Sequence, residues 1–340
     1  MPTACIQQPG ASVRLESERL LVSFADEDLH PQKRVIPLHD VDRLILTDAV
    51  SLSSPALAEL LRRQIPVSLT DTRGRFLGAF HPASPAHGAS RLHHYQRTLD
   101  PSFTLATATR IIVAKIYNQR RLLQRVAANR RAANRPVPES VDPALAALNR
   151  SMAAAGRAAS LDSLRGHEGT AAARYFSAWA SLLPDSFPFE RRSTRPPLNP
   201  VNAALSFSST LLYNEMHAFL HAHGLDPALG LLHTTENNRW SLALDLIEPF
   251  RPVVAEALTL DLFSHKILST DHFEPKNGGT YLTRQGRGKL LLQYEKRMER
   301  QFMSESAGHR TTLRRQLENQ ATLLKTALDR PDSFEPFLMN

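Results

Sequence analysis

The spacing of apolar residues changes once along the chain, and this change constrains the fold strongly. Before residue 80, apolar and polar residues alternate in short runs, as in strands with one buried face. These runs lie at residues 11–16, 19–24, 33–38, 42–47, 67–70 and 74–80. One short helix is expected at 54–63, where serine precedes Pro55 at the first helical position. The first part of the chain is therefore predicted to be mainly β-sheet.

From Pro101 onward, apolar residues recur with the period of a helix. Ile111, Ile116 and Leu123 belong to an apolar stripe that runs between arginines. Further helices are expected at 161–183, 201–223, 241–265, 283–303 and 308–328. Two prolines should interrupt the helix at 241–265, because proline removes a backbone hydrogen bond. The second part of the chain is therefore predicted to be helical.

These patterns predict an α+β fold with a small N-terminal β-sheet domain, which carries one short helix, and a larger all-helical C-terminal catalytic domain. A chain of 340 residues is long enough for two domains that each bury a core. The expected boundaries are 1–88 for the β domain, 89–100 for a linker, 101–330 for the helical domain and 331–340 for a loosely held tail.

Composition excludes several classes of protein. No apolar run approaches the ~20 residues that span a bilayer, and no secretion signal is expected at the N-terminus. Cys5 is the only cysteine, which excludes an intrachain disulfide and thiolate zinc clusters. These features predict a soluble protein in a reducing, cytoplasmic setting.

The positive charge of the chain is concentrated in one segment. The net charge is +8, yet residues 91–135 alone carry ten basic residues against a single acid, Asp100. Nine of the ten are arginine, whose guanidinium group suits bidentate contact with phosphate. A localised basic stripe is typical of nucleic-acid-binding proteins. Within it, Arg120, Arg121 and Arg125 are candidate DNA contacts.

Residues 230–252 hold the candidate catalytic groups. His233 precedes a short polar turn, and Asp245 and Glu248 follow at the start of an expected helix. Their three-residue spacing places both carboxylates on one helix face. An imidazole with hard carboxylate oxygens suits a magnesium- or manganese-type ion, which phosphodiester chemistry commonly uses. A solvated acidic face is the simpler explanation when this pattern stands alone.

Two other motifs join this one. The run GHEGTAAARYF at 166–176 places Glu168 on a predicted helix, and RPPLNPVNA at 195–203 leads into the next one. Together with LDLIE at 244–248, and in this order, they resemble the CRISPR-associated integrase that inserts new spacers into CRISPR arrays. The resemblance covers nearly the whole chain, including IPLHDVDRLIL at 36–46 and the residues from 281 to 297.

The resemblance implies a site and a reaction. In that family a divalent cation, Mg or Mn, is held by residues that match Glu168, His233 and Glu248, and Asp245 matches a further acidic residue of the same site. The implied reaction is metal-dependent cleavage and transesterification of DNA, which serves antiviral defence. Pro249 departs from the family pattern, in which a polar or acidic residue often follows the third ligand. A kink at this proline is expected to shift Glu248.

The resemblance also implies partners. Family members form homodimers through the β domain, and two dimers flank a small CRISPR-associated adaptation partner in a heterohexamer. The DNA substrates are a protospacer duplex and the CRISPR repeat.

Several alternatives remain open on the sequence. The protein could be a general nuclease for branched or single-stranded DNA in repair, or an inactive DNA-binding scaffold. His233 could act as a general base with two carboxylates on the metal. Arg195, Arg239 and Arg251 could contact phosphate or pair with nearby acids. His217 and His221 share a helix face, but with no third ligand in sight they are interpreted as surface or core residues.

Overall fold

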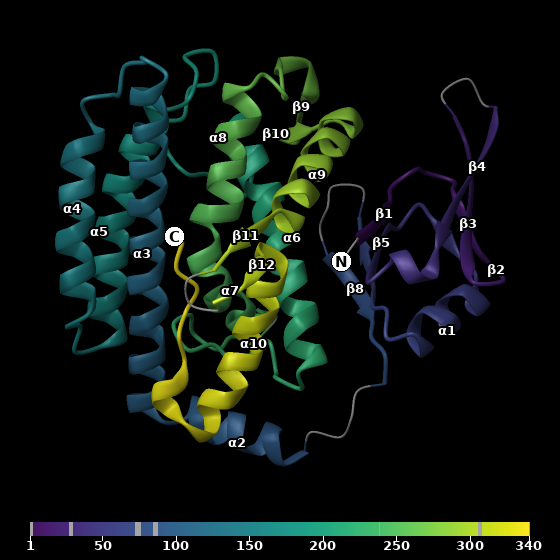
Figure 1. Ribbon diagram of the computed structural model, residues 1–340, viewed down its shortest axis with the longest axis horizontal. Coiled ribbons are helices and arrows are strands. Elements are labelled where there is room, and N and C mark those ends of the chain that lie inside the picture. The colour runs from purple at the N-terminus through teal and green to yellow at the C-terminus, as the bar shows by residue number, and fades with distance from the viewer. Residues whose placement is uncertain are drawn as a thin grey trace. The chain divides into compact units, whose positions relative to one another are not determined.

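The computed structural model describes residues 3–26, 30–71, 76–83, 88–237, 239–304 and 308–339 (Figure 1). The chain divides into two compact units, Met1–His87 and Gly88–Asn340. The first is built mainly of strands and the second mainly of helices, so the predicted α+β fold class is confirmed. Among the described residues, no helix combines the length and apolarity that crossing a bilayer requires.

The first unit contains two four-stranded sheets. In the first sheet the strand order is β1-β5-β7-β8, with parallel pairs β1–β5 and β5–β7 and an antiparallel pair β7–β8. The order in the other sheet is β4-β3-β2-β6. The strands are β1 (Thr3–Ile6), β2 (Ser12–Glu16), β3 (Arg19–Ala25), β4 (Pro31–Pro37), β5 (Arg43–Thr47), β6 (Ser51–Leu52), β7 (Val67–Thr70) and β8 (Phe76–Phe80).

Apolar residues of the alternating runs form the buried core of this unit. Leu20, Leu44 and Leu46 are fully buried in its core, and Leu60 joins them from helix α1 (Ser54–Arg62). The Oγ of Ser53 caps α1 by accepting from a backbone N–H, as serine commonly does. The predicted strand at 74–80 begins within residues 72–75, which lie outside the described residues, and its described part is β8.

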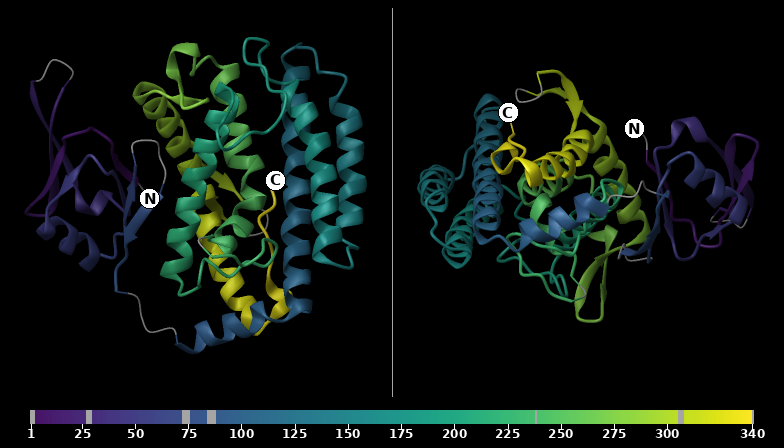
Figure 2. Two further views of the ribbon diagram at one scale, coloured as in Figure 1. Left: turned by 180° about the vertical axis from the view of Figure 1, so that it is seen from behind. Right: turned by 90° about the horizontal axis from the view of Figure 1, so that it is seen from below.

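The second unit is mainly helical, and its helix α6 is largely buried against α7, α8, α9 and α10. Its helical elements are α2 (Gly88–Thr98), α3 (Pro101–Ala132), α4 (Val141–Ala155), α5 (Leu161–Ala180), α6 (Pro200–Ala222), α7 (Ser241–Ile247), η2 (Glu248–Phe250), η3 (Pro252–Glu256), α8 (Ala257–Ser264), α9 (Arg284–Glu299) and α10 (Leu313–Asp329). Helices α3, α4 and α5 run alongside one another and each packs against the other two (Figures 1 and 2). Asp100 caps the 32-residue α3 and Asn199 caps α6, in each case directly before a proline.

Two short antiparallel hairpins, which the sequence patterns did not predict, interrupt the helices. They pair β9 (Phe273–Lys276) with β10 (Gly279–Leu282), and β11 (Gln301–Met303) with β12 (Arg310–Thr312). The latter pair occupies residues expected at the end of one helix and the start of the next. The observed helices α9 and α10 are therefore shorter than the predicted ones.

The segment 89–100, predicted as a linker, lies almost wholly within helix α2. The segment contains no proline, and its side chains pack on the helical unit. His94 is buried, with Nδ1 accepting from the backbone N–H of Asp226, and the Nε of Arg97 donates to the carbonyl of Leu328 at 2.8 Å. These contacts stabilise a helix where composition had suggested a loose connection.

The C-terminal residues are also held more firmly than expected. Phe334, Phe337 and Met339 are buried, and the ring of Phe337 stacks on that of Phe250 with centroids 4.7 Å apart. Asn118 of α3 is fully buried between the tail and η2. The expectation of a loosely held tail is corrected, because its aromatic side chains complete the core of the helical unit.

Candidate metal centre

Two of the predicted metal ligands meet at one lysine. Lys115 of α3 places its Nζ 2.5 Å from Oε1 of Glu168 on α5 and 2.6 Å from Oε2 of Glu248 in η2. The side chains are 12%, 21% and 5% exposed, respectively. Charges this deeply buried need partners, because removing them from water is costly. Helix packing thus brings two carboxylates that lie 80 residues apart in the sequence to a shared cation.

Pro249 sets the position of Glu248. Helix α7 ends at Ile247, and Glu248 begins the 3-10 turn η2, because a proline cannot continue the helical hydrogen-bond pattern. The Nδ2 of Asn118 donates to the carbonyl of Pro249 at 2.7 Å and fixes this turn against α3. The interruption predicted at Pro249 is therefore present, and it orients Glu248 toward α3.

The charged state of this cluster follows from its neighbours. Burial by itself would raise the pKa of Glu248, but the charges of Arg251 and Lys115 lower it to about 2. Burial would likewise lower the pKa of Lys115, yet Glu248 and Glu168 raise it above its ordinary value. Glu248 and Lys115 are thus both ionised at neutral pH.

His233 is held by Asp245 through a tight turn. The Oδ2 of Asp245 accepts from the backbone N–H groups of Leu231 at 2.6 Å and Leu232 at 2.9 Å, and its Oδ1 accepts from that of His233 at 3.1 Å. The same Oδ1 contacts Nδ1 of the His233 ring. A β-carbon on Gly230 would lie 2.1 Å from the His233 carbonyl oxygen, so this position accepts only glycine.

This arrangement separates the roles of His233 and Asp245. Asp245 is fully buried, and both of its oxygens are engaged by the turn. A proton on Nδ1 of His233, donated to Asp245, leaves Nε2 with a lone pair for a ligand or a proton. Carboxylates behind metal-binding histidines commonly fix the tautomer in this way. The geometry gives Asp245 the role of positioning His233.

The donor set suits a hard divalent cation, because Glu168 and Glu248 offer carboxylate oxygens and His233 offers an imidazole nitrogen. Within the described residues, however, the ligand atoms of these three do not all lie within 4.8 Å of one another. The ammonium of Lys115 contacts both carboxylates instead. An ion that binds both carboxylates would therefore compete with Lys115.

Sequence reasoning missed two buried groups beside this centre. Lys115 is the single lysine in the arginine-rich segment 91–135, and it falls on the face of α3 that also carries Ile111 and Ile112. A charge within an apolar stripe signals a buried partner, so this position could have been found. Glu256 is also buried, and burial raises its pKa to about 7, although the nearby Tyr175 hydroxyl and the positive charges of Lys115 and Arg251 oppose this effect.

The three arginines that flank the motif in sequence have different surroundings. The Nε of Arg251 lies 2.9 Å from Oε1 of Glu248, which agrees with ion pairing to a candidate ligand. Arg239 lies 3.7 Å from the exposed Glu236. Arg195 is exposed, and no ion pair with it is recorded among the described residues.

The arginines of the basic stripe also differ from one another in their surroundings. On α3, the Nη1 of Arg120 donates to Oδ1 of Asn149 at 2.7 Å, and its guanidinium lies over the ring of Tyr117. Arg121 makes a long contact, 3.5 Å, with a glutamine one turn later on the same helix. Arg125 is exposed and lines a cavity in the second unit. The structure does not bring these three residues into the metal centre.

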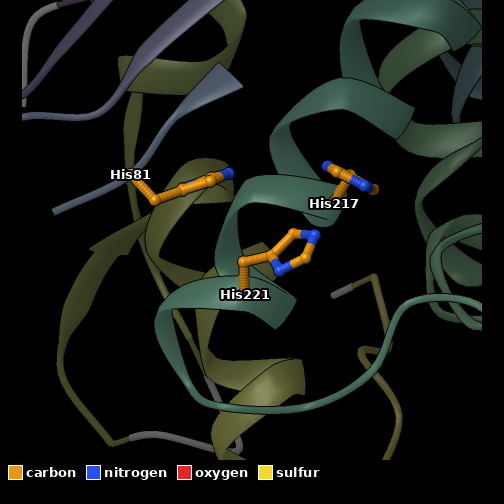
Figure 3. A group of neighbouring side chains, drawn as sticks. All are labelled: His81, His217 and His221. Carbon is orange, nitrogen blue, oxygen red and sulfur yellow. The ribbon is translucent and has the colours of Figure 1, made fainter. Parts of the chain in front are cut away.

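Figure 3 shows His217 and His221 on successive turns of α6. Their rings lie 4.6 Å apart in an edge contact, and Trp240 packs against the His217 ring at 4.9 Å. His217 is buried. The third imidazole drawn there, His81, belongs to the first unit. Within the second unit, these histidines are thus part of an aromatic cluster.

The sequence and the fold are similar to those of known proteins. The model of the family described as CRISPR associated protein Cas1 matches residues 4–296. The chain is 33% identical over 341 residues to "CRISPR-associated endonuclease Cas1 1" of Thermus thermophilus, and the match covers 99% of both proteins. It is 36% identical over 333 residues to a "CRISPR-associated exonuclease Cas4/endonuclease Cas1 fusion" of Geobacter sulfurreducens, with 95% of this chain covered.

The chain spans only about half the length of such fusion relatives, 56% in the Geobacter protein. A solved structure titled "Casposase bound to integration product" shares the fold with a TM-score of 0.82 at 20% identity, and the match covers 97% of this chain and 91% of the casposase chain. The family match covers most of the sequence, and the relatives exceed 30% identity over nearly all of it. The chain therefore belongs to the CRISPR-associated Cas1 family.

Proposed function

We propose that this protein is a divalent-metal-dependent DNA endonuclease and integrase that inserts new spacer DNA into a CRISPR array by transesterification. The observation that carries the proposal is the meeting of Glu168 and Glu248 at one buried cation, Lys115. It is supported by family membership and by a fold shared with a casposase whose structure is bound to integration product.

The proposed chemistry assigns a role to each residue. Glu168, His233 and Glu248 would hold Mg or Mn, which would offset the negative charge that builds up on phosphate oxygens during attack. Asp245 keeps the Nε2 of His233 available by holding Nδ1. Arg251 and Lys115 keep Glu248 ionised, and an ionised carboxylate is the form that binds a cation.

The proposed partners follow from the same family. Three arginines of α3, the half-buried Arg120 and Arg121 and the exposed Arg125, are proposed to contact DNA phosphates. Arg195, Arg239 and Arg251 lie closer in sequence to the reaction centre and are proposed to do the same. We propose a homodimer formed through the first unit, and a small adaptation partner in a heterohexamer. A solved chain of similar fold is titled "Cas6-RT-Cas1--Cas2 complex", which supports such a partner. We place the reaction in the cytoplasm.

The decisive experiment measures strand transfer of a short DNA duplex into a repeat-bearing plasmid, with Mn²⁺ or with a chelator. Transfer is expected only with the metal, and both Glu168→Ala and His233→Ala should abolish it. Glu139→Ala, which changes an exposed glutamate in a loop, serves as the matched control. Undiminished transfer by the two site variants would overturn the proposal.

A second arm separates integration from general nuclease activity. Incubation of branched or single-stranded DNA with the protein alone, without the adaptation partner, gives cut strands if the protein is a repair nuclease. Joined strands that require the repeat sequence identify an integrase. If neither cut nor joined strands form although Mn²⁺ is bound, the protein is a DNA-binding scaffold.

A further inference from the structure

The second unit contains a cavity of about 410 Å³ whose wall is strongly basic. Its lining includes Arg125 of α3, Lys296 and Arg297 of the last turn of α9, and Arg300 directly after that helix. Apolar side chains, including that of Phe337 from the C-terminal segment, form another part of the wall. A cavity of this size lies in the range that accommodates a small organic ligand.

Positive charge in this cavity exceeds negative charge. The four basic side chains face one lining carboxylate, Asp261, which pairs with Arg297. Among the described residues, no ion pair is recorded with Arg125, Lys296 or Arg300. The cavity therefore holds an excess of about three positive charges, and groups of like charge gathered in a hollow attract a counter-anion.

Arg297 shows that these charges act on one another. Its Nη1 donates to the carbonyl of Val253 at 3.0 Å, but its buried Nε has no hydrogen-bond acceptor among the described residues. Burial lowers the pKa of Arg297, Asp261 opposes this effect, and the charges of Arg125 and Arg300 lower it further. A bound anion would supply an acceptor for the Nε of Arg297 and would reduce the repulsion among the three arginines.

The cavity is distinct from the candidate metal centre. None of the candidate ligands lines it. Arg125 follows Lys115 by ten residues on α3, which places it about 15 Å farther along the helix axis at 1.5 Å per residue. A ligand held here would contact the π-helical segment η3 through Val253.

We propose that this cavity binds the phosphate group of a nucleotide, either free or at the end of a DNA strand. Three guanidinium groups and an ammonium match the two charges and three oxygens of a terminal phosphate better than a single carboxylate. The amides of Gln293 and Gln301 line the same wall, and the apolar side leaves room for a sugar and a base. The site does not require the proposed metal chemistry.

The test uses calorimetric titration of the full chain in the presence of a chelator, so that no metal-dependent binding contributes. The probes are dAMP, a short single-stranded oligonucleotide with a 5′-phosphate, and deoxyadenosine, which lacks a phosphate. At least one phosphorylated probe should bind, and deoxyadenosine should not. The double variant Arg125→Gln/Arg300→Gln should bind that probe about tenfold more weakly or worse, because charge-assisted contacts are lost.

Both substituted side chains are exposed, so the variant is expected to fold, and Lys289→Gln on the same helix α9 outside the cavity is the matched control. Pocket-dependent binding of dAMP identifies a free nucleotide as a sufficient ligand. Pocket-dependent binding of the oligonucleotide but not of dAMP, lost when the same oligonucleotide carries a 5′-hydroxyl in place of the phosphate, identifies a strand end. The proposal is overturned if no phosphorylated probe binds, if deoxyadenosine binds equally well, or if the double variant binds like the wild type.

Discussion

The carboxylate of Asp245 contacts Nδ1 of the His233 ring and also accepts the backbone N–H of His233 at 3.1 Å. One buried side chain thus fixes both the backbone and the ring of a candidate metal ligand. Asp245 therefore acts through His233, because its own oxygens are taken up by the backbone at 231–233 and by the His233 ring.

Replacing Asp245 by asparagine should weaken metal binding without removing a ligand. The amide cannot accept through both of its terminal atoms, so it cannot hold the turn and the Nδ1–H of His233 at once. We expect Mn²⁺ affinity to fall about 10- to 100-fold in calorimetric titration. Asp162→Asn, at a side chain that is 92% exposed, should leave the affinity unchanged. Equal affinities in the two variants would argue against a positioning role.

Lys115→Met should make folding depend on metal. Without the ammonium, the buried carboxylates of Glu168 and Glu248 lose a shared partner, which should cost about 3 kcal/mol or more. A divalent ion would then restore the missing charge, and a ligand that binds only the folded state raises stability. Thermal melting with a chelator should give a lower Tm than wild type, and Mn²⁺ should raise it by more than it raises the wild-type Tm.

Lys289→Met on α9 is the control for the Lys115 variant. It should melt like the wild type, with and without Mn²⁺. If Mn²⁺ stabilises the Lys115 variant no more than it stabilises the wild type, the ion does not compete with this lysine.

Asn118→Ala should destabilise the helical unit and release the C-terminal segment. The Nδ2 of this buried asparagine donates to the carbonyls of Pro249 and Phe337, and its Oδ1 accepts the backbone N–H of Met339 at 2.7 Å. Loss of these bonds should lower the free energy of unfolding by about 3 kcal/mol. Urea unfolding measures this change, and carboxypeptidase digestion reports the release. Asn149→Ala, at an exposed position, should change stability by only about 0.5 kcal/mol.

The helical unit should lose stability as the pH falls from 6.5 toward 4. Burial lowers the pKa of His94 from 6.5 to about 4, against the charge of Asp226, and its Nδ1 accepts a backbone N–H in the neutral form. Between these pH values the unfolded chain binds a proton that the folded chain does not, so stability rises with pH across this window. The contribution is about 3 kcal/mol when fully developed.

The variant His94→Gln should therefore show a smaller loss of Tm between pH 7 and pH 5 than the wild type. Its amide can still accept the N–H of Asp226 but does not titrate. His265→Gln, at an exposed histidine, should keep the wild-type pH profile. The explanation fails if the two variants have the same profile.

Local features of the fold could be predicted because their causes are local. The change from alternating to helical spacing near residue 100 separates two kinds of secondary structure, which correspond to the two units. Asp100 before Pro101 and Asn199 before Pro200 begin helices through hydrogen bonds within three residues. The helix at 89–100 and the buried tail were not foreseen, because their conformation depends on burial against distant helices.

The sequence by itself determined the two kinds of secondary structure, the family resemblance, and the candidate site residues His233, Asp245 and Glu248. Only the tertiary structure decided that Lys115 lies between Glu168 and Glu248, and that four basic side chains share a cavity with Phe337. The physical reason is that these contacts join residues far apart in the chain. Their distances are set by how the helices pack, which no spacing within one segment encodes.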